Sequence, residues 1–288
     1  MRFCIVTPCR DAAAFIDETI FSVISQAGPF SIRYHVQDGG STDGTLDKLD
    51  EWRRLLACNF PRCCNEVEFT YASEPDRGMY EAVARGFRVC GLGDIMAWIN
   101  ADDRYAPSGF AVVMHVMERW PEIHWVTGRI SIVTRDGYQK HLSARLFPQK
   151  AIRAGVFDLR RFPRLAIAQD STFWRTGLWN AAGGVNADLK LTGDYDLWRR
   201  FANHAELVTL DATLSSFRER PGQLSENLSA YHAELDQRMT PQEKEMCDRV
   251  AAEYQACRSE QQRTAAGFAA RAAMFDVQAN AWKLVTAA

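Results

Sequence analysis

GDIMAWINADDRY, residues Gly93–Tyr105, joins an apolar segment to a cluster of polar side chains. The apolar run Ile95–Ile99 stops at Asn100-Ala101-Asp102-Asp103. A short apolar run with polar flanks predicts a strand that is buried in a parallel sheet. Because open α/β sheets bind ligands beyond the carboxyl ends of their strands, the polar turn is a candidate site.

Two interpretations of Asp102 and Asp103 remain open at this point. Adjacent carboxylates beside the amide oxygen of Asn100 are hard ligands that could hold Mg²⁺ or Mn²⁺ against the phosphates of a nucleotide. The same two residues could instead form a turn and cap the helix that Pro107 opens.

Three strand and helix units precede this stretch. Each has a short apolar strand, a turn and a helix with apolar residues on one face, and the expected strands are Phe3–Thr7, Ile32–Gln37 and Val67–Tyr71. Together with residues 95–99 they predict an α/β fold, with a mostly parallel central sheet that is flanked by helices and linked by right-handed crossovers.

The strands of this half all end in polar or conformationally special residues, namely Thr7-Pro8 with Arg10, Asp38-Gly39-Gly40, Glu74 to Arg77, and Asn100 to Asp103. Parallel strands place such ends along one edge, so one crevice would hold several carboxylates and two arginines. Carboxylates can accept hydrogen bonds from a base or ribose, while Arg77 and a metal ion would meet a diphosphate. Asp38-Gly39-Gly40 could also be only a turn, and we interpret Asp43 as a helix cap.

The composition excludes several classes of protein. The 288 residues are 47% hydrophobic and 24% charged, which is typical of a globular chain, and the net charge of -2 argues against a nucleic-acid binder. No apolar run is long enough to span a bilayer and no signal-peptide pattern follows Met1, so we expect a cytoplasmic protein. The eight cysteines lack the paired CxxC spacing of a zinc site, and a disulfide framework is not expected. A GxGxxG fingerprint and a P-loop are also missing, which argues against a dehydrogenase or a kinase.

From about Arg2 to Ser225 the chain resembles the inverting nucleotide-sugar glycosyltransferases of family 2, which have the GT-A fold, a Rossmann-like α/β fold. The resemblance rests on IVTPCRDAAAFIDETIFSVISQ, VQDGGSTDGT, SEPDRGMYEAVARGF, GDIMAWINADD, QDSTFWRTGLW and GDYDLW. It implies a nucleotide site made of Thr7, Pro8, Arg10, Asp38, Asp76, Arg77, Asn100, Ala101 and Asp102. Asn100-Ala101-Asp102 stands where the family carries its Asp-x-Asp metal motif, which implies that Asp102 binds Mn²⁺ or Mg²⁺. Asn100 replaces the first acid of that motif, and this weakens the metal prediction.

The second half opens with an expected strand, Ile123–Thr134. A basic segment follows, with one acid, Asp158, among the cations Lys140, Arg145, Lys150, Arg153, Arg160, Arg161 and Arg164. It could be an ordinary solvated face, which we rank first, or it could attract an anionic acceptor such as a phosphate-linked lipid. In the next motif, QDSTFW, Gln169 is a candidate acceptor-binding residue, whereas Phe173 or Trp174 could equally belong to the core.

A second chemical centre lies at Leu191-Thr192-Gly193-Asp194-Tyr195-Asp196-Leu197-Trp198. Thr192 is expected to cap a helix with Asp194 in its first turn, where the helix dipole favours the ionised carboxylate. The resemblance implies that Asp194 is the catalytic base, with Gly193 at the position of the family's usual Glu, and we take Trp198 as acceptor-binding. Asp196 competes with Asp194, but it points to another face and could simply pair with Arg199 or Arg200.

The rest of the chain is expected to hold a closing strand pair, at Glu206–Leu210 and Thr213–Arg218, and then helices. Thr240-Pro241-Gln242-Glu243 is a capping box, and the alanine-rich stretch Ala265–Val285 is also expected to be helical. We therefore divide the chain into a glycosyltransferase domain, 1–228, with a nucleotide-binding half 1–105 and an acceptor half 106–228, and a C-terminal helical extension, 229–288. The extension could pack on the domain, form a homodimer or lie on a membrane, and the first two rank above the third because its charge is mixed.

The function implied is inverting transfer of a sugar from a nucleoside-diphosphate sugar, expected to be a UDP-sugar, to a glycan or lipid-linked acceptor. A role in surface glycan or glycoconjugate synthesis, at the inner face of the membrane, would suit such a protein. Arg220 stands where the family commonly has a histidine, and its guanidinium could bind the leaving diphosphate through two hydrogen bonds. An inactive nucleotide-sugar-binding homologue and, more weakly, a nucleotidyltransferase are the alternatives.

Overall fold

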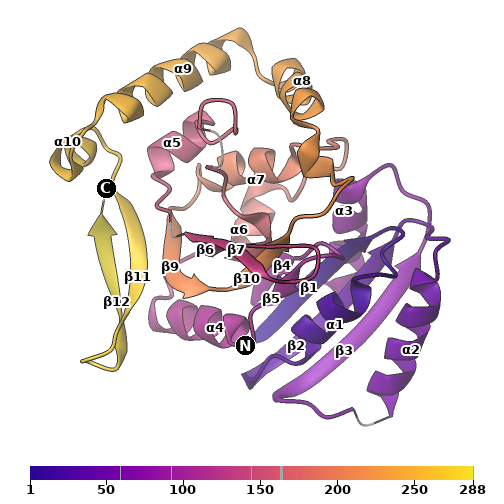
Figure 1. Cartoon of the computed structure of the whole chain (residues 1–288). Helices are drawn as coiled ribbons and strands as arrows, with labels where there is room; N and C mark the ends of the chain where they lie inside the picture. The colour runs from indigo at the N-terminus through magenta and orange to yellow at the C-terminus, as the bar shows by residue number, and fades with distance from the viewer. Residues whose placement is uncertain (59, 92, 144, 163–164, 288) are drawn as a thin grey trace.

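The structure is a computed structural model that describes residues 1–58, 60–91, 93–143, 145–162 and 165–287. Within these residues, twelve strands form one sheet with helices on both sides (Figure 1). Its main path runs β12-β11-β9-β6-β8-β4-β1-β2-β3, and β5, β7 and β10 pair beside that path. The α/β class that the sequence predicts is confirmed.

The N-terminal half contains the predicted alternation of strands and helices. Its elements are β1 (Arg2–Cys9), α1 (Ile16–Ile24), β2 (Gly28–Asp38), α2 (Thr45–Ala57), β3 (Cys64–Ser73), α3 (Met79–Cys90) and β4 (Ile95–Trp98). All three strand pairs here are parallel, with β1 between β2 and β4. All four residues of β4 are buried, as expected for a strand covered on both faces.

The register of these strands brings their carboxyl ends together. Cys9 at the end of β1 pairs with Asp38 at the end of β2, and Asp38 pairs with Ser73 at the end of β3. On the other side of β1, Val6 pairs with Trp98, the last residue of β4. The polar segments that follow these strands therefore begin along one edge, as predicted.

In the second half, one strand of the main path runs antiparallel to its two neighbours, and the strands beyond it return to the first direction. Its elements are β5 (Arg104–Tyr105), α4 (Gly109–Arg119), β6 (Trp125–Val133), β7 (Gln139–Ser143), α5 (Gln149–Ala154), the 3₁₀ turn η1 (Gln169–Ser171), β8 (Thr172–Arg175), α6 (Thr176–Ala182), α7 (Gly193–Phe201), β9 (Leu207–Thr213) and β10 (Ser215–Arg218). Strand β8 is antiparallel to both β4 and β6, whereas β9 is parallel to β6. The predicted pairing between the last two strands is wrong, because β9 pairs with β6 and β11 while β10 pairs with β5 and β6.

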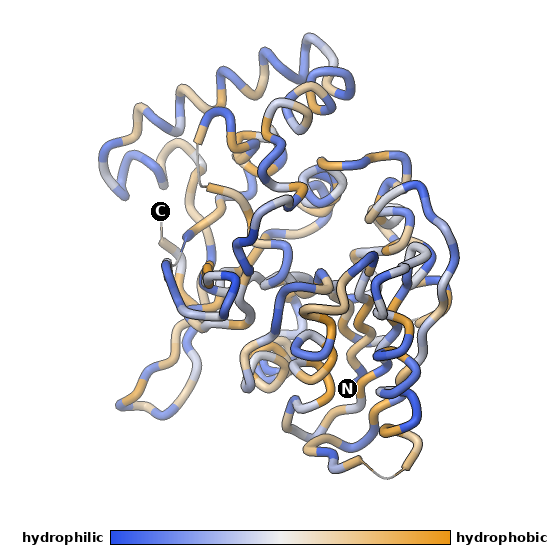
Figure 2. The backbone as a smooth tube through the Cα atoms, turned by 45° about the vertical axis from the view of Figure 1, so that its right-hand side comes forward, coloured by the Kyte–Doolittle hydropathy of each residue, from blue (hydrophilic) through white to orange (hydrophobic). Residues whose placement is uncertain are grey.

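Indole rings fill the core between the sheet and α7. The rings of Trp98 and Trp198 stack with centroids 5.8 Å apart, and the rings of Trp125 and Trp174 pack against Trp198 at 5.7 and 5.8 Å. Phe173 and Trp174 have no exposed surface, so the core interpretation of these two residues is confirmed. Figure 2 shows that hydrophobic and hydrophilic residues are interleaved along the backbone.

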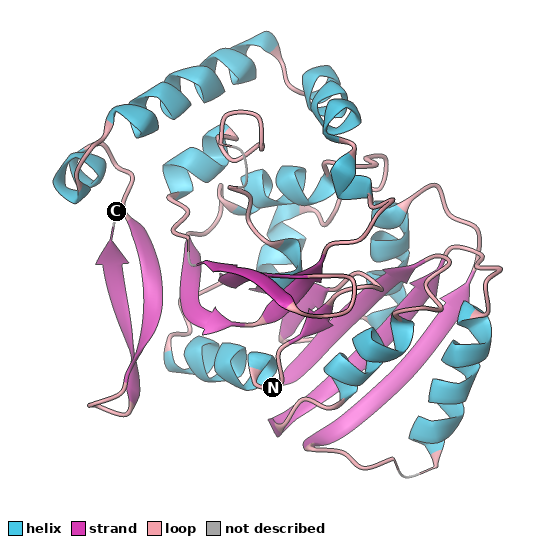
Figure 3. Cartoon of the chain, in the orientation of Figure 1, coloured by secondary structure: helices cyan, strands magenta, loops and turns pink. Residues whose placement is uncertain are grey.

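Helices begin the C-terminal extension, as predicted. After the 3₁₀ turn η2 (Leu224–Glu226) come α8 (Leu228–Arg238), α9 (Pro241–Ala256) and α10 (Glu260–Ala265), which arch over the top of the molecule in Figure 3. The capping box at the start of α9 is confirmed, because Thr240 and Glu243 exchange both expected hydrogen bonds. None of the described helices is long and apolar enough to cross a membrane.

The helix expected at Ala265–Val285 is wrong. The chain instead forms a hairpin of β11 (Ala270–Asp276) and β12 (Ala281–Ala287), and β11 pairs in parallel with β9. Alanine favours helices locally, but pairing with the free side of β9 overrides that weak preference. Asn280, in the turn of the hairpin, has a positive φ of 49° that a helix would not allow.

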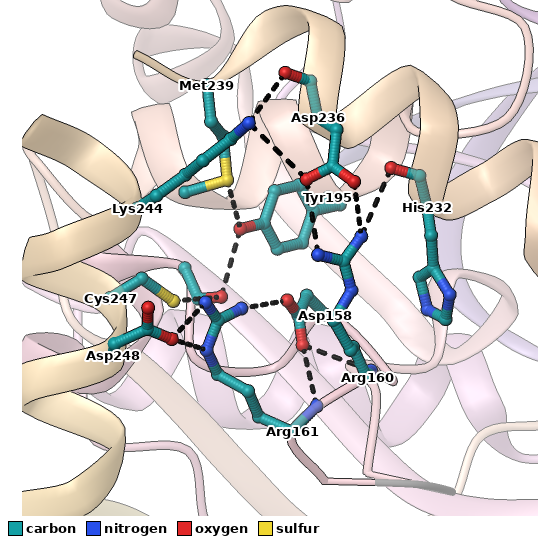
Figure 4. Close-up of polar contacts among 11 residues, drawn as sticks. Asp158, Arg160, Arg161, Tyr195, His232, Asp236, Met239, Lys244, Cys247 and Asp248 are labelled. Carbon is teal, nitrogen blue, oxygen red and sulfur yellow. Dashed lines mark hydrogen bonds and ion pairs between the residues drawn. The ribbon is translucent and has the colours of Figure 1, made fainter. Parts of the chain in front are cut away.

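Cations of the basic segment tie this extension to the domain. Arg160 contacts Asp236 of α8 at 3.1 Å, Arg161 contacts Asp248 of α9 at 2.5 Å, and Lys150 contacts Glu253 of α9 at 2.9 Å. Figure 4 shows the first two of these pairs, together with the contact between Arg161 and Asp158. The basic segment is therefore more than a solvated face, and these three cations are already engaged with acids. Arg164 lies outside the described residues.

Candidate active site

The turn after β4 holds two carboxylates in different surroundings. Asp103 is 1% exposed and accepts hydrogen bonds from the Arg218 backbone N–H at 2.8 Å and from the Asn100 amide at 3.2 Å. Burial, and then the nearby charges of Asp170 and Asp102, raise the pKa of Asp103 well above its ordinary value. Asp103 therefore supports the turn, and Asp102 is the carboxylate available for ligand chemistry.

Arg218 is a site residue that the sequence reasoning missed. It is 2% exposed, and its guanidinium donates to the Asp102 carbonyl at 2.8 Å and to the Glu18 carboxylate at 2.6 Å. A buried arginine needs such partners, so β10 holds the turn of β4 firmly. The sequence does contain a sign of its position. Phe217-Arg218-Glu219-Arg220 alternates, which places Arg218 on the same side of an extended chain as Arg220.

The structure brings Arg220 to Asp102. The Arg220 Nε lies 2.7 Å from the Asp102 Oδ2, and the two side chains are 34% and 12% exposed. The guanidinium carbons of Arg218 and Arg220 lie 5.1 and 5.5 Å from the centre of the Phe15 ring. Contact with the aromatic ring and with Asp102 fixes the position of the Arg220 cation.

The donor set for a metal ion is small. Among the described residues, no group of three or more His, Cys, Asp or Glu side chains could hold one. The Asn100 Oδ1 is buried and meets no hydrogen-bond donor among the described residues, and it belongs to the same turn as Asp102. One carboxylate and one amide oxygen fit Mg²⁺ or Mn²⁺ that takes its other ligands from a diphosphate and water.

The first strand contributes less polar surface than the sequence suggests. Thr7 is fully buried, and its hydroxyl shares a hydrogen bond of 2.9 Å with that of Tyr34. Pro8 is also buried, whereas Arg10 is exposed and lies 3.9 Å from Asp11. Of these predicted nucleotide contacts, Arg10 has the accessible side chain.

Asp38 holds its own loop together. It has no exposed surface, and its carboxylate accepts hydrogen bonds from the backbone N–H groups of Gly40 and Ser41 and from the hydroxyls of Ser41 and Ser73. The turn interpretation therefore has direct support, and contact between Asp38 and a base stays a prediction.

The loop after β3 reaches across to the second half. Asp76 accepts a hydrogen bond from the Gly78 N–H at 2.8 Å, next to Gly39 of the neighbouring loop. The Arg77 side chain is 63% exposed and pairs with Glu81 at 3.0 Å and Asp188 at 3.3 Å. The predicted phosphate contact, Arg77, thus lies where the loop before α7 approaches the nucleotide half.

Asp194 has one oxygen fixed and one oxygen available. Its Oδ1 accepts hydrogen bonds from the Tyr80 hydroxyl at 3.0 Å and from the Tyr195 N–H at 2.8 Å. No described residue donates to its Oδ2. Burial raises the pKa of Asp194, and the hydrogen bonds from Tyr195 and Tyr80 offset that effect in part.

Packing explains why residue 193 is glycine. A Cβ atom on Gly193 would lie 2.6 Å from the ring of Tyr80, which is the residue that orients Asp194. The expectation that Thr192 caps α7 through its side chain is wrong, because the Thr192 hydroxyl donates to Glu234 of α8 instead. Sequence reasoning missed both Tyr80 and Glu234.

The other candidates near α7 have structural partners. Asp196 pairs with Arg200 at 2.7 Å, which confirms the salt-bridge interpretation. Gln169 donates to the Trp98 carbonyl at 2.6 Å, and Trp198 is 3% exposed within the indole core. Acceptor binding by Gln169 and Trp198 stays a prediction.

Comparisons with known proteins bear on the family and the fold of the chain. The model of the family described as Glycosyl transferase family 2 matches residues 4–172. No curated protein matches the chain. Among solved structures, Staphylococcus aureus TarS 1-349 in complex with UDP-GlcNAc has a TM-score of 0.60 at 16% identity, over 79% of this chain and 61% of that one.

Two further structures share the fold. The mannosyltransferase PcManGT from Pyrobaculum calidifontis, in complex with GDP-Man and Mn²⁺, has a TM-score of 0.57 at 14% identity, over 92% of this chain and 78% of that one. GalNAc-T7 with UDP, GalNAc and Mn²⁺ has a TM-score of 0.56 at 13% identity, over 92% and 54%. The chain thus spans less than two thirds of the length of the TarS and GalNAc-T7 chains. The family match over more than half of the sequence shows that the chain belongs to glycosyl transferase family 2, and the solved structures show that it has the GT-A fold.

Proposed function

We propose that the chain transfers a sugar from a nucleoside-diphosphate sugar, expected to be a UDP-sugar, to an acceptor hydroxyl with inversion at the anomeric carbon. The observation that carries this proposal is the state of Asp194, whose Oδ1 is held by Tyr80 and whose Oδ2 meets no donor among the described residues. A half-buried carboxylate with a raised pKa is suited to accept the proton of an attacking hydroxyl.

The reaction is a single displacement. The acceptor oxygen bonds to the anomeric carbon as the bond between that carbon and the diphosphate breaks, and the hydroxyl proton passes to Asp194. The nucleoside diphosphate leaves with the bonding electrons, and Arg220 stabilises its charge. Asp102 and Asn100 would hold Mn²⁺ or Mg²⁺, which supplies further positive charge to a diphosphate.

The donor class has support from the comparisons, because the TarS and PcManGT structures contain UDP-GlcNAc and GDP-Man. We place Thr7, Pro8, Arg10, Asp38, Asp76, Arg77 and the turn 100–102 around the nucleotide, with Gln169 and Trp198 on the acceptor side. The acceptor is a glycan or a lipid-linked glycan of surface glycan synthesis, and the protein acts in the cytoplasm at the inner face of the membrane.

The test compares two aspartates on the same helix. A thermal-shift screen of UDP- and GDP-sugars with Mn²⁺ identifies the donor, since a ligand that binds only the native state raises its stability. Asp194→Asn should then bind the donor as wild type does and lose transfer by about 10²- to 10⁴-fold, the usual contribution of a general base. Asp196→Asn, which loses only the pair with Arg200, should retain transfer.

The same assay separates the alternatives. Comparable turnover of Asp194→Asn and wild type would remove the base role. Donor binding by the wild type without transfer to glycan or lipid-linked acceptors would favour an inactive homologue. Release of pyrophosphate instead of nucleoside diphosphate would indicate a nucleotidyltransferase.

A further inference from the structure

The loop that leads into Asp194 is held by a residue of the C-terminal extension. Helix α7 begins at Gly193 after Thr192, and the Thr192 side chain makes no capping bond to the helix. The first N–H groups of a helix need partners from outside it, and so does a tight loop that precedes one. In this protein the loop finds those partners on α8.

The Glu234 carboxylate of α8 accepts four hydrogen bonds from three consecutive residues. Its Oε1 accepts the Lys190 N–H at 2.8 Å, and its Oε2 accepts the N–H groups of Leu191 and Thr192 at 2.9 Å and the Thr192 hydroxyl at 2.8 Å. A carboxylate that receives several backbone N–H bonds is a strong and directional anchor. Burial alone would raise the pKa of Glu234, but the bonds from Leu191, Lys190 and Thr192 lower it overall.

A second contact connects this anchor to the proposed base. Tyr80 donates to Asp194 at 3.0 Å, and its hydroxyl also lies 3.3 Å from the Leu191 carbonyl. The residue that orients Asp194 therefore touches the loop that Glu234 holds. A shift of residues 190–192 would displace both the start of α7 and one partner of Tyr80.

The helix that carries Glu234 also covers Asp194. Tyr231, one turn before Glu234 and on the same face of α8, lines a cavity of about 30 Å³ together with Asp194, Phe157 and Trp198. Ion pairs at Asp236 of α8 and Asp248 of α9, which Figure 4 shows, and at Glu253 of α9 hold the extension in this place. The base is thus positioned by contacts within the domain and by contacts from outside it.

We propose that Glu234 is a positioning residue for Asp194, so that the C-terminal extension, residues 229–288, forms part of the catalytic machinery. This inference rests on the proposed function, because it assigns Glu234 a role through the base. Without its carboxylate, the loop 190–192 loses the acceptor of four hydrogen bonds and Asp194 loses its fixed direction. Small displacements of a reacting group can cost about 100-fold in rate.

The kinetic experiment uses the full chain and three substitutions. Glu234→Ala should lower kcat by roughly 10- to 100-fold while the donor Kd and the KM for the donor stay within twofold of wild type. Glu234→Gln keeps one carbonyl acceptor for the loop and should recover part of kcat. Asp50→Asn is the matched control, because it removes a paired carboxylate from another helix, α2, where the partner is Arg53, and it should keep kcat.

Hydrogen exchange gives a readout that does not need activity. The amides of Lys190, Leu191 and Thr192 should exchange faster in Glu234→Ala than in wild type, and at the wild-type rate in Asp194→Asn. An unchanged exchange rate in Glu234→Ala would overturn the positioning role, as would an equal loss of kcat in Asp50→Asn. If the wild type transfers no sugar, the proposed function fails, and the exchange rates still decide whether Glu234 holds the loop. Should Glu234→Ala not fold, Glu234→Gln carries both measurements.

Discussion

Replacing Arg220 by alanine would remove the cation that now lies against Asp102. Their contact is 2.7 Å long and partly shielded, with 34% of the Arg220 side chain and 12% of the Asp102 side chain exposed. A divalent ion that uses the Asp102 carboxylate must first displace this guanidinium. The arginine and the metal ion are therefore alternatives at one carboxylate, and removal of the first should strengthen binding of the second.

The size of this effect follows from the contact. A hydrogen bond between charged groups contributes about 1.5 to 3 kcal/mol, and exposure of a third of the arginine places this pair near the lower end of that range. Since about 1.4 kcal/mol corresponds to a factor of ten, Arg220→Ala should bind Mn²⁺ about tenfold more tightly than wild type. Transfer without added metal should fall by roughly 100-fold, because one donor to the leaving diphosphate is lost.

Two measurements test this reasoning. Calorimetric titration with Mn²⁺ gives the affinity of each protein, and initial rates at increasing Mn²⁺ show how far the ion restores transfer in the variant. Arg53→Ala is the control, because Arg53 pairs with Asp50 on the exposed side of α2. If Arg220→Ala has the wild-type affinity for Mn²⁺ and the same dependence of rate on Mn²⁺, Arg220 and the ion do not compete and the proposal fails.

Three further predictions follow from the contacts of the site. Asp38→Ala should lower the free energy of unfolding by about 2 to 3 kcal/mol in urea denaturation, because buried donors of its loop lose their acceptor; a calorimetric titration with unchanged nucleoside-diphosphate affinity would leave Asp38 with its loop role alone. Gly193→Ala should lower kcat about tenfold or more and destabilise the fold by about 1 to 3 kcal/mol, because its Cβ would displace Tyr80, whereas Gly177→Ala, whose Cβ meets nothing within 4 Å, should do neither. As the pH is lowered, kcat should fall with a midpoint above about 3.9, the ordinary pKa of aspartate. The reason is that burial raises the pKa of Asp194 and only its ionised form is a base. A kcat that stays constant down to that pH would contradict the assignment.

Local signals were sufficient for much of the fold. The apolar runs that became β1 to β4 are each followed by a turn signal and an amphipathic helix, so neighbouring residues alone specify these units. The capping box at Thr240 was also readable, because both of its partners lie within four residues. The salt bridge between Asp196 and Arg200 was foreseen for the same reason, since the residues lie one helical turn apart.

Long-range contacts could not be read in this way. Arg218 meets the turn at Asp102 across more than a hundred residues, and Glu234 meets Thr192 across more than forty. Nothing near either residue in the sequence indicates those partners. The hairpin 270–287 was missed for a related reason, because its strands depend on β9 for pairing and its alanines favour a helix when taken alone.

Asp38 illustrates a different limit. Its place at the end of β2 was predicted correctly, yet position alone did not tell whether the carboxylate faces a ligand or its own loop. The hydroxyl of Ser73, which comes from the neighbouring strand, uses part of its hydrogen-bonding capacity. A strand end thus identifies a site more reliably than it identifies the residues that touch the ligand.

The pairing of β11 with β9 also has a consequence for the order of folding during synthesis. Strand β9 is complete at Thr213, but its parallel partner does not exist until the ribosome has added residues 270–276. During that interval one side of β9 offers unpaired backbone groups, which can recruit another strand and aggregate. A nascent chain arrested between α9 and β11 should therefore depend on chaperones more than the finished protein does, and release of the hairpin should end that dependence.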